Sequence, residues 1–372
     1  MFSRRSFIRN SSKTLLASAL GASGAAGFSF EMPAKIPKNM EQNAKKLGVA
    51  LVGLGKYSSG QLAPALQETQ NAWLAGVVSG SPGKAHRWQQ QYGFPEKNIY
   101  SYDNFDALAE NSDIDIVYIV LPNAMHAEFT IRALEAGKHV ICEKPMATSV
   151  EDCDRMLAAA EKAGKMLSIG YRLHFEPYNG EMMRLGQNKV FGPIQHLRAE
   201  NGMNGTEGWR LDRELAGGGP LMDLGIYCVQ GVRYTTGMEP IAVTAIELPR
   251  GNPLLFKEVE AGLKWQLEFP GGLIAECATS YEQEMNLLRA EASKGSFELA
   301  PAYPYSGQKG HAPDGDMNFP HVNQQALQID DFAAAVRDGR PTPVPGEMGR
   351  QDVKILMAIY EAMRTGSKVS IE

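Results

Sequence analysis

The stretch LGVALVGLGKYS, residues 47–58, predicts the architecture of the whole chain. Its apolar run Val49–Val52 has the composition of a buried strand. Gly53 and Gly55 follow at the spacing of the first two glycines of a dinucleotide-binding turn, and the next residues can open a helix whose N-terminus would face phosphate groups. The third glycine position is Ser58, so the fingerprint is incomplete. On this stretch alone, an ordinary strand–turn–helix unit remains the alternative.

The length of 372 residues is too great for one compact core and suits two domains. Apolar residues make up 44% and charged residues 21%, which is typical of a soluble globular protein. The net charge of −5 gives no reason to expect a nucleic-acid partner. We predict an α/β fold class, with a Rossmann dinucleotide-binding domain over residues 47–170. An α+β domain with a large open, mostly antiparallel sheet is predicted over residues 171–372.

The first thirty residues differ from domain sequence. They contain the pair Arg4-Arg5, then Phe7, then a mildly apolar run over residues 15–28 that is rich in Gly, Ala and Ser. This run is too short and too small in its side chains to anchor the chain in a bilayer. Residues 1–30 therefore predict a twin-arginine signal peptide, a periplasmic location and no membrane anchor. A disordered basic tail is the alternative.

The polar segment over residues 31–46 predicts a solvated linker, or an arm that lies across a partner or a cofactor. The four cysteines form no Cys-x-x-Cys pair and lie in or beside apolar runs, which predicts buried free thiols. The seven histidines lack metal-ligand spacing, so we expect no metal ion.

The residues that follow the second predicted strand, Trp73–Val78, indicate which of the two nicotinamide cofactors is bound. In many NAD enzymes an acidic residue ends this strand and binds the ribose 2′-hydroxyl. Here the strand runs into Ser79, and no acid follows before Lys84. A serine can hydrogen-bond a 2′-phosphate and a lysine can neutralise it, so this pair predicts NADP rather than NAD. A solvated lysine at the start of a helix is the alternative for Lys84.

Two further strands end at the sheet edge where ligands bind in open α/β folds. Their terminal residues are Pro122, Asn123 and His126 after one strand, and Glu143, Lys144 and Pro145 after the other. Lys144 would point into the same crevice as the glycine turn, where it can polarise a reacting oxygen. A surface ion pair with Glu143 is the alternative.

The second domain contains one helix, predicted over residues 220–235, with potentially reactive side chains. Asp223 and Tyr227 lie four residues apart and therefore share one helix face. A carboxylate one turn before a phenol can orient a catalytic group. A cation is needed beside the phenol, and Lys144 would supply it if the domains close over the crevice. A helix-start carboxylate and a packed tyrosine are the alternative.

The rest of the sequence predicts the remaining strands, loops and helices. In the second domain, strands are predicted over residues 194–200, 242–248, 258–269, 272–280, 289–292 and 295–299. Loops are predicted over residues 202–219 and 300–318, and helices over residues 104–111, 323–337 and 351–364.

These motifs together resemble the glucose–fructose oxidoreductase (Gfo/Idh/MocA) family of nicotinamide-dependent sugar oxidoreductases, from about Lys46 to the C-terminus. The paired-arginine leader matches the layout of the family's periplasmic members. The resemblance implies a catalytic set of Lys144, Asp223 and Tyr227. It implies a cofactor crevice lined by Gly53, Gly55, Lys56, Tyr57, Ser79, Lys84, Pro122, Asn123, His126, Glu143, Lys144 and Arg172. It implies sugar contacts from Lys144, His174, Trp209, Arg210, Asp223 and Tyr227.

The resemblance also implies an activity. A tightly bound NADP would take a hydride from C1 of an aldose to give an aldonolactone, and the NADPH would then reduce a second sugar. Tyr227 would accept the hydroxyl proton, Lys144 would polarise the oxygen and Asp223 would hold the geometry. Three alternatives are an aldose 1-dehydrogenase with exchangeable NADP, a nicotinamide-dependent glycosidase and a non-catalytic sensor. An apolar open sheet face needs covering, which predicts a homodimer or homotetramer.

Overall fold

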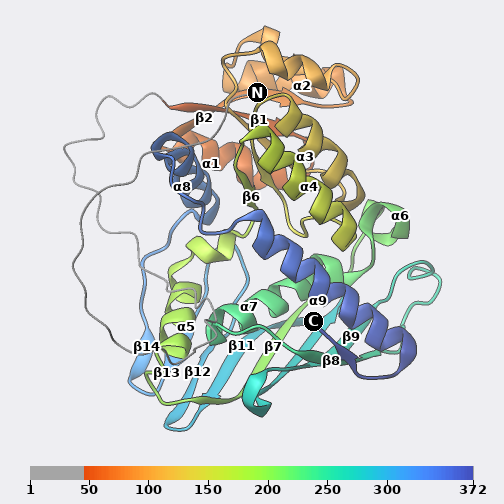
Figure 1. Ribbon diagram of the computed structural model, residues 1–372, viewed down its shortest axis with the longest axis vertical. Helices are drawn as coiled ribbons and strands as arrows, with labels where there is room; N and C mark the ends of the chain where they lie inside the picture. The colour runs from red at the N-terminus through yellow and green to blue at the C-terminus, as the bar shows by residue number, and fades with distance from the viewer. Residues whose placement is uncertain (1–45, 372) are drawn as a thin grey trace, which may run out of the picture.

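Two β-sheets with helices packed on them form the part of the chain that the computed structural model describes, residues 46–371 (Figure 1). The predicted signal peptide and nearly all of the predicted arm, residues 1–45, lie outside the described residues. The first sheet is built from strands up to residue 169, and the second begins at residue 194. This arrangement confirms the predicted fold class.

The first sheet is parallel throughout, with the strand order β3-β2-β1-β4-β5-β6. Its strands are β1 (Leu47–Val52), β2 (Ala72–Val78), β3 (Ile99–Tyr100), β4 (Ile116–Ile119), β5 (His139–Cys142) and β6 (Leu167–Ile169). Helices lie on both faces, so the central strands are buried on both sides and read as continuous apolar runs. The strand order reverses between β1 and β4, and ligands bind beyond the carboxyl ends of the strands at such a point.

The helices of this domain are η1 (Ser58–Leu62), α1 (Ala63–Glu68), α2 (Pro82–Tyr92), η4 (Asn123–Met125), α3 (His126–Glu135) and α4 (Val150–Ala163). The predicted helix over residues 104–111 is instead a 3₁₀ helix, η3 (Phe105–Glu110). Its buried residues, Phe105 and Leu108, are three apart, and the tighter 3₁₀ winding places such residues directly above one another.

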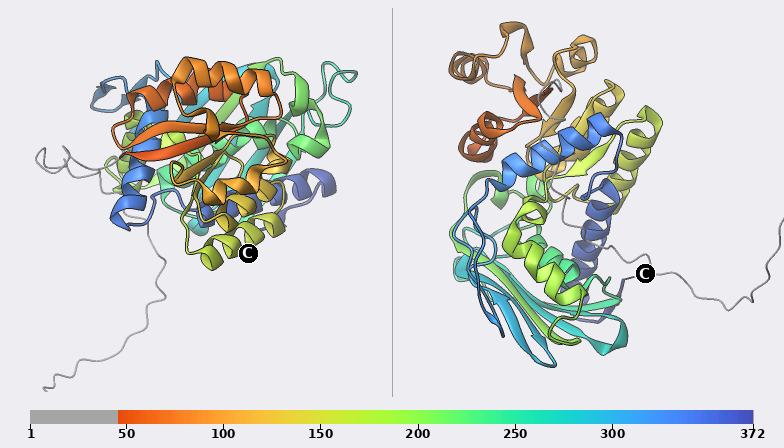
Figure 2. Two further views of the ribbon diagram at one scale, coloured as in Figure 1. Left: turned by 90° about the horizontal axis from the view of Figure 1, so that it is seen from above. Right: turned by 90° about the vertical axis from the view of Figure 1, so that its left-hand side faces the viewer.

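The second sheet is mixed, with the order β14-β13-β12-β11-β7-β10-β9-β8-β15. Its strands are β7 (Ile194–Asn204), β8 (Ala242–Glu247), β9 (Gly262–Glu268), β10 (Ile274–Ser280), β11 (Glu282–Ala292), β12 (Gly295–Leu299), β13 (Gly310–Ala312), β14 (Gly315–Met317) and β15 (Val369–Ser370). Only the β7–β10 pair is parallel among these described strands. The helices α5 (Pro177–Gln187), α7 (Ile226–Thr236) and α9 (Gly346–Thr365) cover one face of the sheet (Figure 2).

Several predicted boundaries in this domain were wrong. Strand β7 continues to Asn204, which was assigned to a loop, because it pairs there with β11. The predicted loop over residues 300–318 contains the hairpin of β13 and β14, and the last long helix begins at Gly346 rather than at residue 351. Strand pairing joins distant parts of the chain, so a local pattern does not report it.

The uncovered face of the second sheet is polar rather than apolar. Side chains on it alternate with buried residues such as Leu197 and Ala199, and they include His196, Arg198, Lys264, Gln266, Glu276 and Arg289. Ion pairs form along this face, for example between Arg198 and Glu200 at 2.6 Å. The expectation of an apolar face was therefore wrong, and the homodimer or homotetramer stays a prediction without that support.

Helix α8 (Gln324–Asp338) returns from the second sheet to the first domain (Figure 1). Ile329 and Phe332 are buried in the core of the first sheet. The Asp330 carboxylate accepts hydrogen bonds of 2.7–2.9 Å from the main-chain N–H groups of Gln70 and Asn71. A single predicted boundary at residues 170–171 did not include this return, which ties the two domains together.

Candidate active site

The glycine turn after β1 has the geometry that a dinucleotide requires. Gly53 has a φ of +92°, and a Cβ there would lie 2.3 Å from the carbonyl oxygen of Val120, so only glycine fits. No atom lies within 4 Å of a Cβ placed on Gly55, so the backbone there is open to a ligand. Ser58, at the third glycine position, is fully buried and donates a 2.6 Å hydrogen bond to the Gly53 carbonyl. The serine therefore fastens the helix start to the turn.

The residues predicted to select the cofactor lie beside this turn. Ser79 directly follows β2, and its hydroxyl accepts a 3.1 Å hydrogen bond from the Ser81 N–H. The Lys84 ammonium reaches back to the turn and donates a 3.0 Å hydrogen bond to the Leu54 carbonyl. A serine hydroxyl and a lysine charge thus border the end of β2 where an acidic residue would select NAD. This arrangement fits a ribose 2′-phosphate.

Strand β5 leads directly into Glu143 and Lys144, and the Lys144–Pro145 peptide bond is cis. Glu143 is buried, and its carboxylate accepts a 2.7 Å hydrogen bond from the Tyr118 hydroxyl, which in turn accepts one from Gln328 on α8. Burial raises the pKa of Glu143. The residue therefore sits at the base of the crevice and is not the surface partner of Lys144 that the alternative interpretation required.

Lys144 and Asp223 meet across the interface between the two domains. The Lys144 Nζ donates to the Asp223 main-chain carbonyl at 2.7 Å and lies 3.3 Å from the Asp223 Oδ1. The other carboxylate oxygen, Oδ2, accepts from Arg210 at 2.8 Å and from the Tyr281 hydroxyl at 3.0 Å. Both Lys144 and Asp223 are mostly buried, with side chains 12% and 14% exposed. Their contact depends on tertiary structure, because the residues are 79 positions apart.

The charges in this cluster determine its protonation. Burial by itself would raise the pKa of Asp223, but Lys144 and Arg210 outweigh it and, with the hydrogen bonds from Arg210 and Tyr281, lower that pKa to about 2. Burial opposes the charged form of Lys144, but Tyr227, Asp223 and Glu143 outweigh it and raise the pKa of Lys144. At neutral pH the pair is therefore an ammonium and a carboxylate.

The ring of Tyr227 lies between two cations. Lys144 Nζ is 4.7 Å from the ring centre, and the Arg172 guanidinium carbon is 5.1 Å from it. Tyr227 is one turn after Asp223, at the junction of a π-helix, η7 (Leu221–Gly225), and α7. The structure thus brings together Lys144, Asp223 and Tyr227, the set that the resemblance implied.

Two residues predicted for the cofactor crevice have polar side-chain atoms that bind main-chain carbonyl groups of the protein. His126 is fully buried, and its two ring nitrogens each lie 2.9 Å from a main-chain carbonyl oxygen, one of Pro145 and one of Leu121. Asn123 is 5% exposed and donates to the Ala216 carbonyl of α6 (Arg213–Ala216) at 2.8 Å. These residues hold the loops that form the crevice.

Arg172, which we had assigned to the cofactor crevice, is 4% exposed. It donates to Gln324 at 2.5 Å and to the Tyr303 carbonyl at 2.6 Å. Its guanidinium carbon lies 5.1 Å from the ring centre of Tyr227 and 4.5 Å from that of Tyr305. Its hydrogen-bond donors are used largely within the protein, so the residue supports the site through Tyr227.

His174 does not join this cluster. Its partly buried ring packs edge-on against Phe175 and Tyr234, with centroids 5.8 and 5.4 Å apart, and Tyr234 lies about two helical turns beyond Tyr227. Burial lowers the pKa of His174 to about 4. The sugar contact that the resemblance implied for His174 is not supported by this position.

We expect His174 to make the fold sensitive to acid. Burial lowers its pKa from the ordinary value of about 6.5 to about 4 in the folded chain. The unfolded chain therefore binds the proton first, and stability is complete above pH 6.5 and falls toward pH 4 by about 3 kcal/mol. Urea unfolding at pH 7 and pH 4.5 measures this loss. His174→Phe keeps the packing and should reduce the dependence, leaving the part that His139, whose pKa burial also lowers to about 4, contributes. Replacing the exposed His86 by Gln should not change it. An unchanged slope in His174→Phe contradicts the assignment.

Sequence reasoning missed Tyr281, Tyr305 and Glu207. Tyr281 directly follows β10 and binds Asp223, and Tyr305 lies 6.0 Å from Tyr57 between ring centroids. Glu207 forms a 2.5 Å ion pair with Lys56 of the glycine turn, which links the two domains over the crevice. The predicted sugar residue Trp209 stacks on Arg210 at 4.7 Å, within η6 (Gly208–Leu211). No local pattern marks these contacts, because each joins loops from distant segments.

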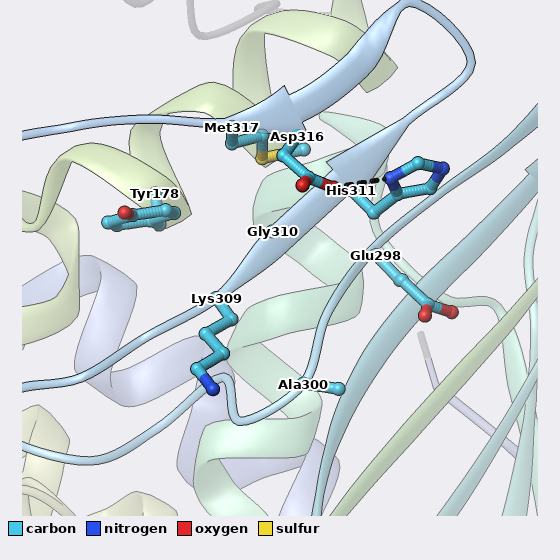
Figure 3. A pocket seen from close by; sticks show the side chains of 8 residues that line it. All are labelled: Tyr178, Glu298, Ala300, Lys309, Gly310, His311, Asp316 and Met317. Carbon is cyan, nitrogen blue, oxygen red and sulfur yellow. Dashed lines mark hydrogen bonds and ion pairs between the residues drawn. The ribbon is translucent and has the colours of Figure 1, made fainter.

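A separate pocket of about 270 Å³ lies between α5 and the edge strands β12 to β14 (Figure 3). Tyr178, Glu298 and Lys309 line it, and a 2.8 Å ion pair between His311 and Asp316 closes one side. None of the residues predicted for the site line this pocket.

Within residues 46–371, no helix is long and apolar enough to cross a membrane, and no cluster of His, Cys, Asp and Glu could hold a metal ion. The four cysteines are buried and free, as predicted.

Comparisons with known proteins agree with this fold. The family model described as an oxidoreductase family with an NAD-binding Rossmann fold matches residues 47–171, and the GFO/IDH/MocA C-terminal domain model matches residues 181–298. The crystal structure of aldose-aldose oxidoreductase from Caulobacter crescentus, complexed with glycerol, superposes with a TM-score of 0.84 at 41% identity. The match covers 88% of this chain and 100% of that one.

Two curated relatives are more distant. D-xylose 1-dehydrogenase [NADP(+)] of Haloarcula marismortui is 29% identical over 346 residues, which cover 87% of this chain and 92% of that protein. D-glucoside 3-dehydrogenase of Escherichia coli is 27% identical over 348 residues, covering 87% and 97%.

Proposed function

Because this chain belongs to the GFO/IDH/MocA oxidoreductase family, we propose that it is an NADP-dependent sugar oxidoreductase that oxidises an aldose at C1 and reduces a second sugar. The proposal rests on one observation: Lys144, Asp223 and Tyr227 lie close together at the carboxyl end of β5. A buried cation, a carboxylate held ionised and a phenol between two cations are the groups that oxidation of a hydroxyl needs. The similarity to an aldose-aldose oxidoreductase supports the substrate class.

The roles of the three side chains follow from their surroundings. When bound, NADP accepts the hydride that leaves C1. Tyr227 takes the proton of the C1 hydroxyl, and the Lys144 ammonium and the Arg172 guanidinium lie near its ring. Lys144 polarises the reacting oxygen, and Asp223 holds Lys144 in position through its carboxylate and its carbonyl. In the return half-reaction, Tyr227 gives the proton to the carbonyl oxygen of the second sugar.

The glycine turn, Ser79 and Lys84 fit NADP. We expect Lys84→Met to reduce the preference for NADP over NAD about tenfold, because it removes the one lysine charge at the predicted 2′-phosphate position and leaves the turn intact. Fluorescence titration of the cofactor-free protein with both cofactors measures this ratio. Lys162→Met, an exposed lysine on α4, serves as the control. An unchanged ratio in Lys84→Met contradicts the assignment.

The cofactor is expected to remain bound between turnovers. This part of the proposal rests on the predicted export signal, because no nicotinamide pool is evident outside the cytoplasm and bound NADPH must then be re-oxidised in place. The ion pair between Lys56 and Glu207 supports it, since it spans the crevice on the solvent side, where both side chains are more than three-quarters exposed. An exposed pair contributes little by itself, so other contacts must supply most of the retention.

A near-UV spectrum of exhaustively dialysed protein tests the proposal, recorded before and after one aldose is added without free cofactor. We expect a stoichiometric rise in reduced-nicotinamide absorbance that a second sugar reverses. No rise without added NADP, but turnover with it, would favour an aldose 1-dehydrogenase with exchangeable cofactor. No response under either condition would overturn the redox proposal, and cleavage of an aryl glycoside would then identify a nicotinamide-dependent glycosidase.

Two further parts of the proposal concern the whole protein. We infer that the chain is exported folded to the periplasm and that it forms a homodimer or homotetramer. Fractionation of cells that express the full chain, compared with an Arg4→Lys, Arg5→Lys double variant, tests export. Light scattering on the purified protein measures the oligomeric state.

A further inference from the structure

The loop between β12 and β13 is held in place by buried polar side chains. Three successive carbonyl groups of this loop, those of Tyr303, Pro304 and Tyr305, accept hydrogen bonds. The donors are Arg172 for the first at 2.6 Å, Gln308 for the second at 2.6 Å and Gln324 for the third at 3.0 Å. These three hydrogen bonds hold the backbone at Tyr305 in place.

The side chain of Tyr305 points from this fixed loop toward the crevice. Its ring centroid is 6.0 Å from that of Tyr57 in the glycine turn, with an interplanar angle of 30°. On another side, the Arg172 guanidinium carbon lies 4.5 Å from the ring centre, and the same guanidinium contacts the Tyr227 ring. Tyr305 thus contacts the cofactor turn through Tyr57 and shares the Arg172 guanidinium with Tyr227.

Although it touches these residues, Tyr305 remains 44% exposed. It is one of few large apolar side chains in the described part of the chain with that much exposure. Large aromatic rings that stay exposed while their backbone is rigidly paired commonly contact a ligand, because ligand pockets are lined by aromatic rings and a few fixed polar groups. The neighbours of this ring place any such ligand beside Tyr227.

We propose that Tyr305 is a substrate-contacting residue that forms an aromatic wall of the sugar subsite, packing its ring on the C–H face of the aldose whose C1 hydroxyl reaches Tyr227. This inference rests on the proposed function. The electron-rich face of an aromatic ring attracts the weakly positive C–H groups of a pyranose, and its flat shape suits that surface. The phenol hydroxyl adds a donor for a sugar oxygen. In this role Tyr305 affects sugar binding more than the chemical step.

A purely structural role would be different. If Tyr305 only covered the Arg172 guanidinium, its removal would disturb Arg172 and, through it, Tyr227. The melting temperature or kcat would then fall, and sugar affinity would change little. A contact with the sugar predicts the opposite result, which separates the two roles.

The test measures binding and turnover of Tyr305→Ala and Tyr305→Phe on the NADP-containing protein, with D-glucose and D-xylose as probes. Calorimetric titration in a Tyr227→Phe background, which keeps the cofactor but should not turn over, gives Kd for each sugar. Stopped-flow absorbance with Tyr227 present gives KM and kcat. We expect Tyr305→Ala to raise Kd and KM about tenfold, the scale of one lost aromatic contact, with kcat within about threefold of the wild type. Tyr305→Phe keeps the ring and should recover most of the affinity. Leu327→Ala, on α8 and 42% exposed, is the matched control.

The outcomes are distinguishable. Unchanged Kd and KM in Tyr305→Ala, with a wild type that binds and oxidises sugars, overturns the inference and leaves the proposed function standing. A lower kcat and melting temperature at unchanged Kd shows that Tyr305 has a structural role, and this result also overturns the inference. A wild type that neither binds nor oxidises a sugar overturns both proposals.

Discussion

Replacing Lys144 by methionine is expected to lower kcat for aldose oxidation by about a thousandfold, the scale of losing one preorganised electrostatic group. Methionine keeps most of the volume of the lysine stem. It removes the charge that faces Tyr227 and the hydrogen bonds to the carbonyl and carboxylate of Asp223. Asp223 then keeps Arg210 and Tyr281 as partners, so the carboxylate remains hydrogen-bonded. Single-turnover absorbance after mixing with an aldose measures the effect.

The control for this variant is Lys264→Met, which removes an exposed lysine from the uncovered face of the second sheet. It should keep the wild-type rate. Cofactor content, read from the absorbance of denatured samples, should be similar in both variants, because the turn residues that face the phosphates are unchanged. A rate within tenfold of the wild type in Lys144→Met would remove the lysine from the mechanism.

Tyr227→Phe should abolish measurable turnover while leaving the cofactor bound. The change deletes one oxygen atom, and the ring can keep its packing between Lys144 and Arg172. Loss of a general base commonly costs a factor of about 100 to 10,000, and here the same group would serve both half-reactions. The measurements are the rate of nicotinamide reduction by the first sugar and, after chemical reduction of the bound cofactor, its rate of oxidation by the second.

Both half-reactions should slow by a similar factor in Tyr227→Phe, because the proton is taken and returned at one oxygen. Tyr92→Phe, on the surface helix α2, is the control and should have no effect. Near-full rates in Tyr227→Phe would transfer the base role to another residue. Tyr305 would then be the next candidate, since it contacts the same guanidinium.

Much of the fold could be predicted from short patterns. The continuous apolar runs predicted parallel strands buried on both faces, and the glycine spacing predicted the turn after β1, because an apolar run and a pair of closely spaced glycines are visible in consecutive residues. The absence of an acid after β2 predicted the cofactor for the same reason. The spacing of Asp223 and Tyr227 predicted a shared helix face.

The patterns failed where distant segments pair. The extension of β7 and the return of α8 to the first sheet depend on partners far along the chain. The hairpin of β13 and β14 is local, but its strands are only three residues long and lie in a segment rich in Gly, Pro and Asp. The polar outer face of the second sheet was not predicted. We assumed that an open sheet has an apolar face and did not examine the alternation of polar and apolar residues along its strands.

By itself, the sequence determined the two-domain α/β architecture, the position of the nucleotide turn and the identity of the catalytic candidates. Only the tertiary structure decided how these candidates interact. It placed Lys144 against Asp223, added Arg210 and Tyr281 as partners of the carboxylate, set His126 between main-chain carbonyls and packed His174 against Tyr234. The physical reason is that periodicity and turn chemistry act over a few residues, whereas ion pairs and pKa shifts depend on burial and on the docking of two domains.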